Sequence, residues 1–240
     1  MGVHLYSRPC VIEYLQAISD KHGIKLLFDA AHAFGCSLRG RMIGNFGECE
    51  VFSFHATKFF NTFEGGAITT NNDELAEKIR LMQNFGFKGM DNVGYIGTNG
   101  KMSEVCAAMG LTNLEEIDHF IAINKRNYNA YKAGIAKIDG LKLIEFNETE
   151  KCNRQYIVVE VTEEYPLNRD ALMEKLRAHN IRARRYFWPG CHRMEPYRSL
   201  QPNAGMMLPI TEAIADHILV LPTGTAVNEE TISTICNHIG

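Results

Sequence analysis

The sequence predicts an α/β fold with a mostly parallel sheet, followed by a smaller α/β unit. In the N-terminal half, short apolar segments of strand length alternate with segments whose apolar residues recur at helical spacing. This alternation is typical of parallel strands joined by helices that cover both faces of a sheet. A second set of strand and helix patterns follows a long helical stretch, so we expect a large domain over residues 1–120 and a small α/β domain over residues 121–240.

Periodicity and capping residues place the first elements. Apolar residues recur at helical spacing over residues 11–21, and Gly23 is suited to end that helix. An apolar strand over residues 24–28 follows and leads directly into Asp29. This order gives a helix and then a buried strand that ends on a carboxylate.

The next elements repeat the pattern. Residues 50–54 and 66–70 read as two short apolar strands. Asn72 then precedes two acidic residues and a helical pattern from residue 73, which is the arrangement of an N-terminal cap with favourable charges in the first turn.

The C-terminal half begins with a helical pattern that runs from Ser103 to about Ile138 with few breaks. Beyond it, the sequence predicts a compact α/β unit with its own apolar pattern. Its expected elements are a strand at 156–161, a helix capped by Asn168 and reaching His179, a strand at 181–187, and a final helix over 229–238 capped by Asn228.

Composition excludes several classes of protein. The chain has 240 residues, of which 45% are hydrophobic and 22% charged, as in ordinary globular proteins. Its net charge of −3 provides no basic stripe for nucleic acid or an anionic membrane. No apolar run approaches the about 20 residues that span a bilayer, and no signal peptide is visible, so we expect a cytoplasmic protein.

Cysteine usage points to a reducing compartment. The seven cysteines are scattered, odd in number and never spaced as Cys-x-x-Cys. The adjacent Cys191 and His192 would chelate zinc poorly, so we predict no metal site.

Two predicted strand ends carry the residues that most clearly indicate chemistry. Asp29 follows the first buried strand, while Ser53 lies near the end of the second and Lys58 follows it, shortly before the Gly65-Gly66 turn. A lysine can form a Schiff base with pyridoxal 5'-phosphate (PLP), and a carboxylate can keep the pyridine nitrogen of PLP protonated. These residues therefore predict a PLP site.

The chain resembles the DegT/DnrJ/EryC1/StrS family of sugar aminotransferases, which have the PLP-dependent transferase fold type I. Each matching segment is a weak signal alone, but their order along the chain is specific. The resemblance rests on segments 29–35, 52–58, 64–67, 84–86, 99–103, 185–192 and 221–224.

The resemblance implies a cofactor role for five residues. Lys58 would be the catalytic lysine and Asp29 the partner of the ring nitrogen, while Ser53 would bind the cofactor phosphate. His32 would contact the ring or its 3'-oxygen, and Asn99 would reach the phosphate of a neighbouring subunit, which implies a homodimer. The alternatives are an exposed lysine, a helix-capping aspartate, a core serine, a satisfied core histidine and a loop asparagine.

Three further residues are candidates for binding substrate. Arg185 and Tyr186 lie in a segment rich in cations and aromatic residues, and we expect them to contact a carboxylate or a nucleotide diphosphate of the substrate. His55 lies near Lys58 and is a weaker candidate. Aromatic residues that fill the core of the small domain are the competing interpretation.

The family resemblance implies an aminotransferase that uses glutamate as amino donor and a nucleotide-linked keto-deoxysugar as acceptor, in polysaccharide or antibiotic sugar biosynthesis. Family members are longer, and their phosphate-binding loop would precede Met1, so we expect a chain that lacks its N-terminal part. A non-catalytic remnant or regulatory module is therefore one alternative. A sugar dehydratase, in which histidine commonly replaces the lysine, is another, and Lys58 argues against it.

Overall fold

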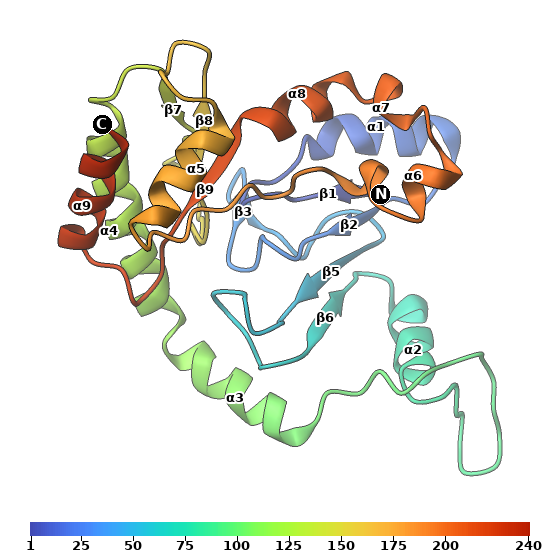
Figure 1. The fold of residues 1–240 in the computed structure, drawn as a ribbon. Coiled ribbons are helices and arrows are strands. Elements are labelled where there is room, and N and C mark those ends of the chain that lie inside the picture. The colour runs from blue at the N-terminus through green and yellow to red at the C-terminus, as the bar shows by residue number, and fades with distance from the viewer. The chain divides into compact units, whose positions relative to one another are not determined.

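The computed structural model describes residues 1–240, which form two compact units (Figure 1). The first unit comprises Met1–Ile121 and Phe146–Gln155, and the second comprises Ala122–Glu145 and Tyr156–Gly240. The peptide 146–155 thus returns to the first unit after the chain has entered the second. The division at residue 120 that we drew from the sequence treats each domain as one continuous piece, and it stays a prediction.

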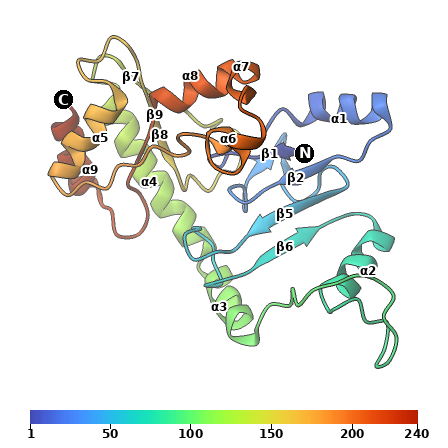
Figure 2. The ribbon, with the colours of Figure 1, turned by 45° about the vertical axis from the view of Figure 1, so that its right-hand side comes forward.

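The first unit is built on a four-stranded sheet in the order β1-β2-β5-β6 (Figures 1 and 2). β1, β2 and β5 are parallel, and β6 is antiparallel to β5. This agrees with the predicted mostly parallel sheet. The strands are Gly2–Val3 (β1), Leu27–Asp29 (β2), Cys49–Ser53 (β5) and Gly66–Thr69 (β6), and a separate two-stranded ribbon pairs Ser37–Leu38 (β3) with Arg41–Met42 (β4).

Helices of the first unit start and stop where their capping residues indicate. The backbone of Gly23 has φ 62° and ends α1 (Ile12–His22), a conformation that costs glycine little. The Asn72 side chain accepts a hydrogen bond from Leu75 N at 3.0 Å and begins α2 (Asp73–Met82). The Ser103 hydroxyl does the same for α3 (Glu104–Glu115). These sequence predictions are confirmed.

An aromatic cluster packs the turn after β2 against β5. The Phe34 ring stacks on Phe60 with centroids 4.5 Å apart and meets Phe52 and Phe54 edge-on at 5.7 Å and 5.4 Å. Edge-to-face and offset contacts of this kind are favourable beyond their buried area. The cluster holds the segments that follow the two strands next to each other.

The predicted helix over residues 103–138 is interrupted. It consists of α3 and α4 (Ile117–Ile135), separated at Glu116, whose φ and ψ of −101° and 5° depart from helical values. The first residues of α4, up to Ile121, belong to the first unit and the remainder to the second.

The second unit contains an antiparallel sheet in the order β7-β8-β9. Asn168 caps α5 and Asn228 caps α9, as predicted from the sequence. The elements are Leu141–Leu143 (β7), Ile157–Val161 (β8), Arg169–Ala178 (α5), Ile218–Leu221 (β9) and Glu229–Ile239 (α9).

The prediction of a strand over residues 181–187 is wrong. Arg184 alone pairs with Val220, through backbone bonds of 2.9 Å and 2.7 Å. The chain then turns, with Trp188 N donating to Arg185 O, and Pro189 can donate no ladder hydrogen bond. Short helices that the sequence did not predict follow at Cys191–Arg193 (η1), Tyr197–Leu200 (α6), Ala204–Met207 (α7) and Pro209–His217 (α8). None of the helices combines the length and apolar character needed to cross a bilayer.

Candidate active site

The parallel pairing of β2 and β5 brings the predicted site residues to one edge of the first sheet. Asp29 pairs with Val51 in the register of these strands, so Ser53 lies two residues further along β5. One carboxylate oxygen of Asp29 accepts a hydrogen bond from Ala31 N at 2.9 Å, which fixes the side chain over its own turn. The carboxyl end of a parallel strand is where α/β proteins commonly place functional groups.

Lys58 lies in the loop that follows β5. Its backbone N–H donates to His55 O at 2.9 Å and closes a turn. Burial lowers the pKa of the half-buried amine, and the negative charge of Asp29 opposes that shift. Asp29 and Lys58 are therefore near enough to interact electrostatically. No hydrogen bond or ion pair engages the amine itself.

His32 completes a group of three titratable side chains with Asp29 and Lys58, called here the first-unit triad. Burial and, to a smaller extent, the positive charge of Lys58 lower the pKa of His32, Asp29 acts in the opposite direction, and the net result is a pKa of about 4. Tyr6 N donates to His32 Nδ1 at 3.3 Å, so that nitrogen carries no proton. The imidazole is thus neutral at pH 7.

The backbone around His32 is held by the returning peptide 146–155. Asn153 Nδ2 donates to His32 O at 3.1 Å and to Phe34 O at 2.8 Å. Gln155 Nε2 donates to the same His32 carbonyl at 3.3 Å, while its Oε1 accepts from Phe59 N at 3.1 Å. Sequence reasoning missed Asn153 and Gln155, which lie far along the chain from His32 and carry no motif.

Ser53 is the last residue of β5, and His55 lies in the loop between this strand and Lys58. Ser53 ends β5 opposite Gly66, and its hydroxyl accepts a long hydrogen bond of 3.4 Å from His55 N. The exposed His55 ring meets Thr57 Oγ1 at 2.9 Å and Glu64 Oε1 at 3.6 Å. Both predicted residues lie close to Lys58 in sequence, and their roles stay predictions.

Asn99 has partners within its own exposed loop. It forms an isolated bridge with Asn84, and its side-chain oxygen accepts a hydrogen bond from Lys101 Nζ at 2.7 Å. The structure does not join Asn99 to the first-unit triad, so its role toward a neighbouring subunit stays a prediction.

Arg185 and Tyr186 lie in the second unit and have local partners. Arg185 is 3.0 Å from Asp170 Oδ2, and its guanidinium carbon lies 3.8 Å from the centre of the Trp188 ring. The Tyr186 ring stacks on Phe187 at 4.8 Å, and its hydroxyl accepts a hydrogen bond from Arg184.

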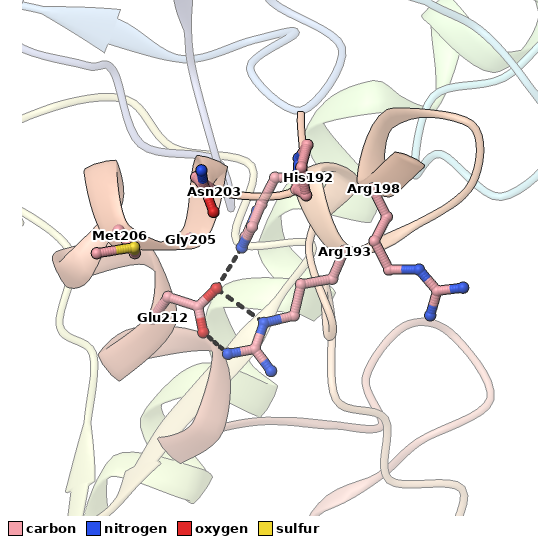
Figure 3. Close-up of a pocket in the computed structure, with 8 residues that line it drawn as sticks. His192, Arg193, Arg198, Asn203, Gly205, Met206 and Glu212 are labelled. Atoms are coloured by element: carbon pink, nitrogen blue, oxygen red, sulfur yellow. Dashed lines mark hydrogen bonds and ion pairs between the residues drawn. The ribbon is translucent and has the colours of Figure 1, made fainter. Parts of the chain in front are cut away.

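A pocket of about 530 Å³ in the second unit is organised around Glu212 (Figure 3). Glu212 forms an ion pair with Arg193, whose Nε donates to it at 2.8 Å, and it is hydrogen-bonded to the His192 ring. Arg198 extends away from Glu212. Arg193 is paired with Glu212 and Arg198 with Glu195, so both arginines of this pocket have a carboxylate partner, unlike the Lys58 amine.

Comparisons with known proteins are consistent with this geometry. The profile of the DegT/DnrJ/EryC1/StrS aminotransferase family matches residues 1–240. The dTDP-4-amino-4,6-dideoxy-D-glucose transaminase of Shigella dysenteriae is 37% identical over 100% of this chain and 65% of its own length. The Escherichia coli protein of the same name is 34% identical over 98% of this chain and 64% of its own length.

A solved structure of DesI in the presence of its TDP-sugar product is also similar. It is 46% identical to this chain, superposes with a TM-score of 0.91, and is matched over 98% of this chain and 60% of its own length. The chain thus spans somewhat less than two thirds of the length of these relatives.

Proposed function

Because this chain belongs to the DegT/DnrJ/EryC1/StrS aminotransferase family, we propose that it is a PLP-dependent enzyme that aminates a nucleotide-linked keto-deoxysugar. The observation that carries the proposal is the first-unit triad, in which Asp29 and Lys58 act electrostatically on each other and on His32. A perturbed amine beside a carboxylate is typical of an active site.

The residues present fit PLP. Lys58 is half-buried, its pKa is lowered, and its amine has no hydrogen bond or ion pair. Deprotonation to the neutral, nucleophilic amine therefore costs less free energy than for an exposed lysine. Asp29 presents a carboxylate at a strand end, where a buried cation would stabilise it. When bound, PLP supplies an electron-withdrawing ring that stabilises negative charge on the carbon that loses a proton.

Each residue then has a distinct task. With PLP present, Lys58 would hold the cofactor through its amine and would accept and return the proton of the amino donor. Asp29 would keep the pyridine nitrogen protonated. The neutral His32 adds no second positive charge beside the Lys58 amine, and Ser53 offers a hydroxyl to the phosphate.

The names of the relatives suggest the substrate. The Shigella and E. coli relatives are named for a dTDP-linked sugar with an amine at carbon 4, and DesI was solved with a TDP-sugar product. We therefore propose a dTDP-linked 4-keto-6-deoxysugar as acceptor and glutamate as donor. Arg185, Tyr186 and His55 are the proposed substrate contacts, and a cytoplasmic homodimer with Asn99 at a shared site is the proposed assembly.

Amino transfer from nitrogen-15 glutamate provides the test. Purified protein is incubated with PLP, the labelled donor and a dTDP-4-keto-6-deoxysugar, and the product is followed by mass spectrometry. We expect a labelled amino sugar, and none with Lys58→Ala. Protein that binds no PLP, or that binds it without transferring nitrogen to any nucleotide-linked ketosugar, would favour the non-catalytic regulatory alternative.

A further inference from the structure

Two buried thiols from distant parts of the chain meet in the first unit. Cys36 follows the turn that contains His32, and Cys152 lies in the returning peptide 146–155. The sulfur atoms of Cys36 and Cys152 each lie 3.5 Å from the carbonyl oxygen of Ser7. Both thiols are free.

The backbone beside these cysteines holds them in place. Ser37 N donates to Lys151 O at 2.9 Å, and Lys151 N donates to the Ser37 hydroxyl at 2.9 Å. Ser37 and Lys151 are the chain neighbours of Cys36 and Cys152. Two bonds therefore fix the peptides that carry the two sulfur atoms against each other.

The two thiols differ in reactivity. The neighbouring Cys152 thiol and burial raise the pKa of Cys36, while the neighbouring Cys36 thiol lowers that of Cys152. Arg154 N also donates to the Cys152 sulfur at 3.4 Å, and the charges of Arg154 and Arg8 favour the thiolate. Cys152 is thus the better nucleophile, since the thiolate is the reactive form.

A small pocket gives access to Cys152. Its volume is about 170 Å³, and Arg8, Phe146 and Cys152 are among its lining residues. The guanidinium carbon of Arg8 lies 5.8 Å from the centre of the Phe146 ring. Hydrogen peroxide is only slightly larger than water, which occupies roughly 30 Å³ in the liquid. The pocket can therefore admit such an oxidant although the thiol is buried.

We propose that Cys36 and Cys152 are a reversible modification site, at which a hydroperoxide converts the two thiols to a disulfide. The Cys152 thiolate attacks one peroxide oxygen, the O–O bond breaks, and the other oxygen leaves as water or alcohol after taking up a proton. The Cys36 sulfur then attacks the Cys152 sulfenic acid, the S–O bond breaks, and water leaves. The two thiols lose two electrons, and the peroxide gains them.

Thiol mapping on the intact protein tests the proposal. Reduced protein is treated with hydrogen peroxide, its remaining thiols are alkylated in denaturant, and it is digested without reductant. We expect a peptide pair joined through Cys36 and Cys152, lighter than the two free peptides by two hydrogen atoms and separated again by dithiothreitol. The proposal fails if both cysteines are alkylated under conditions that oxidise the exposed Cys191, or if Cys152 proceeds to sulfinic acid without the crosslink.

Matched variants assign the order of the two steps. In Cys36→Ser, the sulfenic acid on Cys152 has no partner, and dimedone should label it. In Cys152→Ser, Cys36 should stay unlabelled, and the exposed control Cys191→Ser should keep the wild-type crosslink. Labelling of Cys36 instead of Cys152 would overturn the assignment. Because serine in a buried place can impair folding, circular dichroism is recorded for each variant. The crosslink in the wild-type protein tests the proposal even if a variant does not fold.

Discussion

The charged candidate residues of the two units differ in whether a partner compensates their charge. In the first unit, the Lys58 amine has no hydrogen bond or ion pair, although it is half-buried and within electrostatic reach of Asp29. In the second unit, Arg185 is bound to Asp170 and lies over Trp188. An uncompensated amine in a partly buried place opposes folding, so a fold retains it where chemistry requires it. A compensated guanidinium is compatible with a purely structural role.

The largest effect expected from this difference is that of Lys58→Ala. We expect complete loss of covalent PLP attachment, because the substitution removes the amine that interacts electrostatically with Asp29. Borohydride reduction followed by peptide mapping measures it, with Lys25→Ala, an exposed lysine paired to Glu48, as the control. A pyridoxyl adduct on another lysine in the wild type would contradict the assignment.

Asp29→Asn should leave the fold intact and slow the reaction with the amino donor by on the order of 10²-fold, because a neutral amide no longer keeps the ring nitrogen protonated. Stopped-flow absorbance on protein loaded with PLP measures this half-reaction. Asp20→Asn, on the exposed surface of α1, serves as the control. A rate near that of the wild type would mean that Asp29 only caps its turn.

The buried His32 should make stability depend on pH. Its pKa is about 4 in the folded protein, against about 6.5 when unfolded, so the unfolded state binds more protons between these values. This contribution is complete above pH 6.5 and is lost as the pH falls toward 4, amounting to about 2 kcal/mol between pH 7 and pH 5.

Urea unfolding of the wild type and of His32→Gln at pH 7 and pH 5 measures that contribution. The variant should lose less stability than the wild type over this interval. His55→Gln measures the effect of removing an exposed imidazole. Equal losses in the wild type and His32→Gln would show that His32 is not held neutral by its surroundings.

The smallest effect expected is that of Arg185→Ala. If Arg185 contacts the nucleotide sugar, its loss should raise KM about 10-fold with little change in kcat, the effect of one charged hydrogen bond. Steady-state kinetics measures it, with the exposed Arg182→Ala as the control. An unchanged KM would assign Arg185 to its contacts with Asp170 and Trp188 alone.

Local signals predicted much of the fold correctly. The helices capped by Asn72, Ser103, Asn168 and Asn228 begin where their side chains accept backbone hydrogen bonds. Capping depends on neighbours within one turn, so a sequence can reveal it. The convergence of Asp29 and Lys58 also follows from strands that run parallel, although the roles of these residues remain predictions.

Features that depend on distant contacts were not predictable. Asn153 and Gln155 hold the His32 carbonyl, yet nothing near them in the sequence indicates a partner more than a hundred residues away. The residue pattern over 181–187 resembles that of a strand, but only Arg184 forms backbone pairing, with Val220 of β9. Strand pairing depends on a sheet edge that is available for hydrogen bonding, and the periodicity of apolar residues in the sequence carries no information about that edge.

The peptide 146–155 has a consequence for biosynthesis. Because it supplies Asn153 and Gln155 to the first unit, that unit lacks contacts to His32 and Phe59 until residue 155 has emerged from the ribosome. Domains often fold in order as they are synthesised. Here the first unit gains these contacts only after residues 122–145 of the second unit have been made, while residues 156–240 of the second unit are synthesised later still.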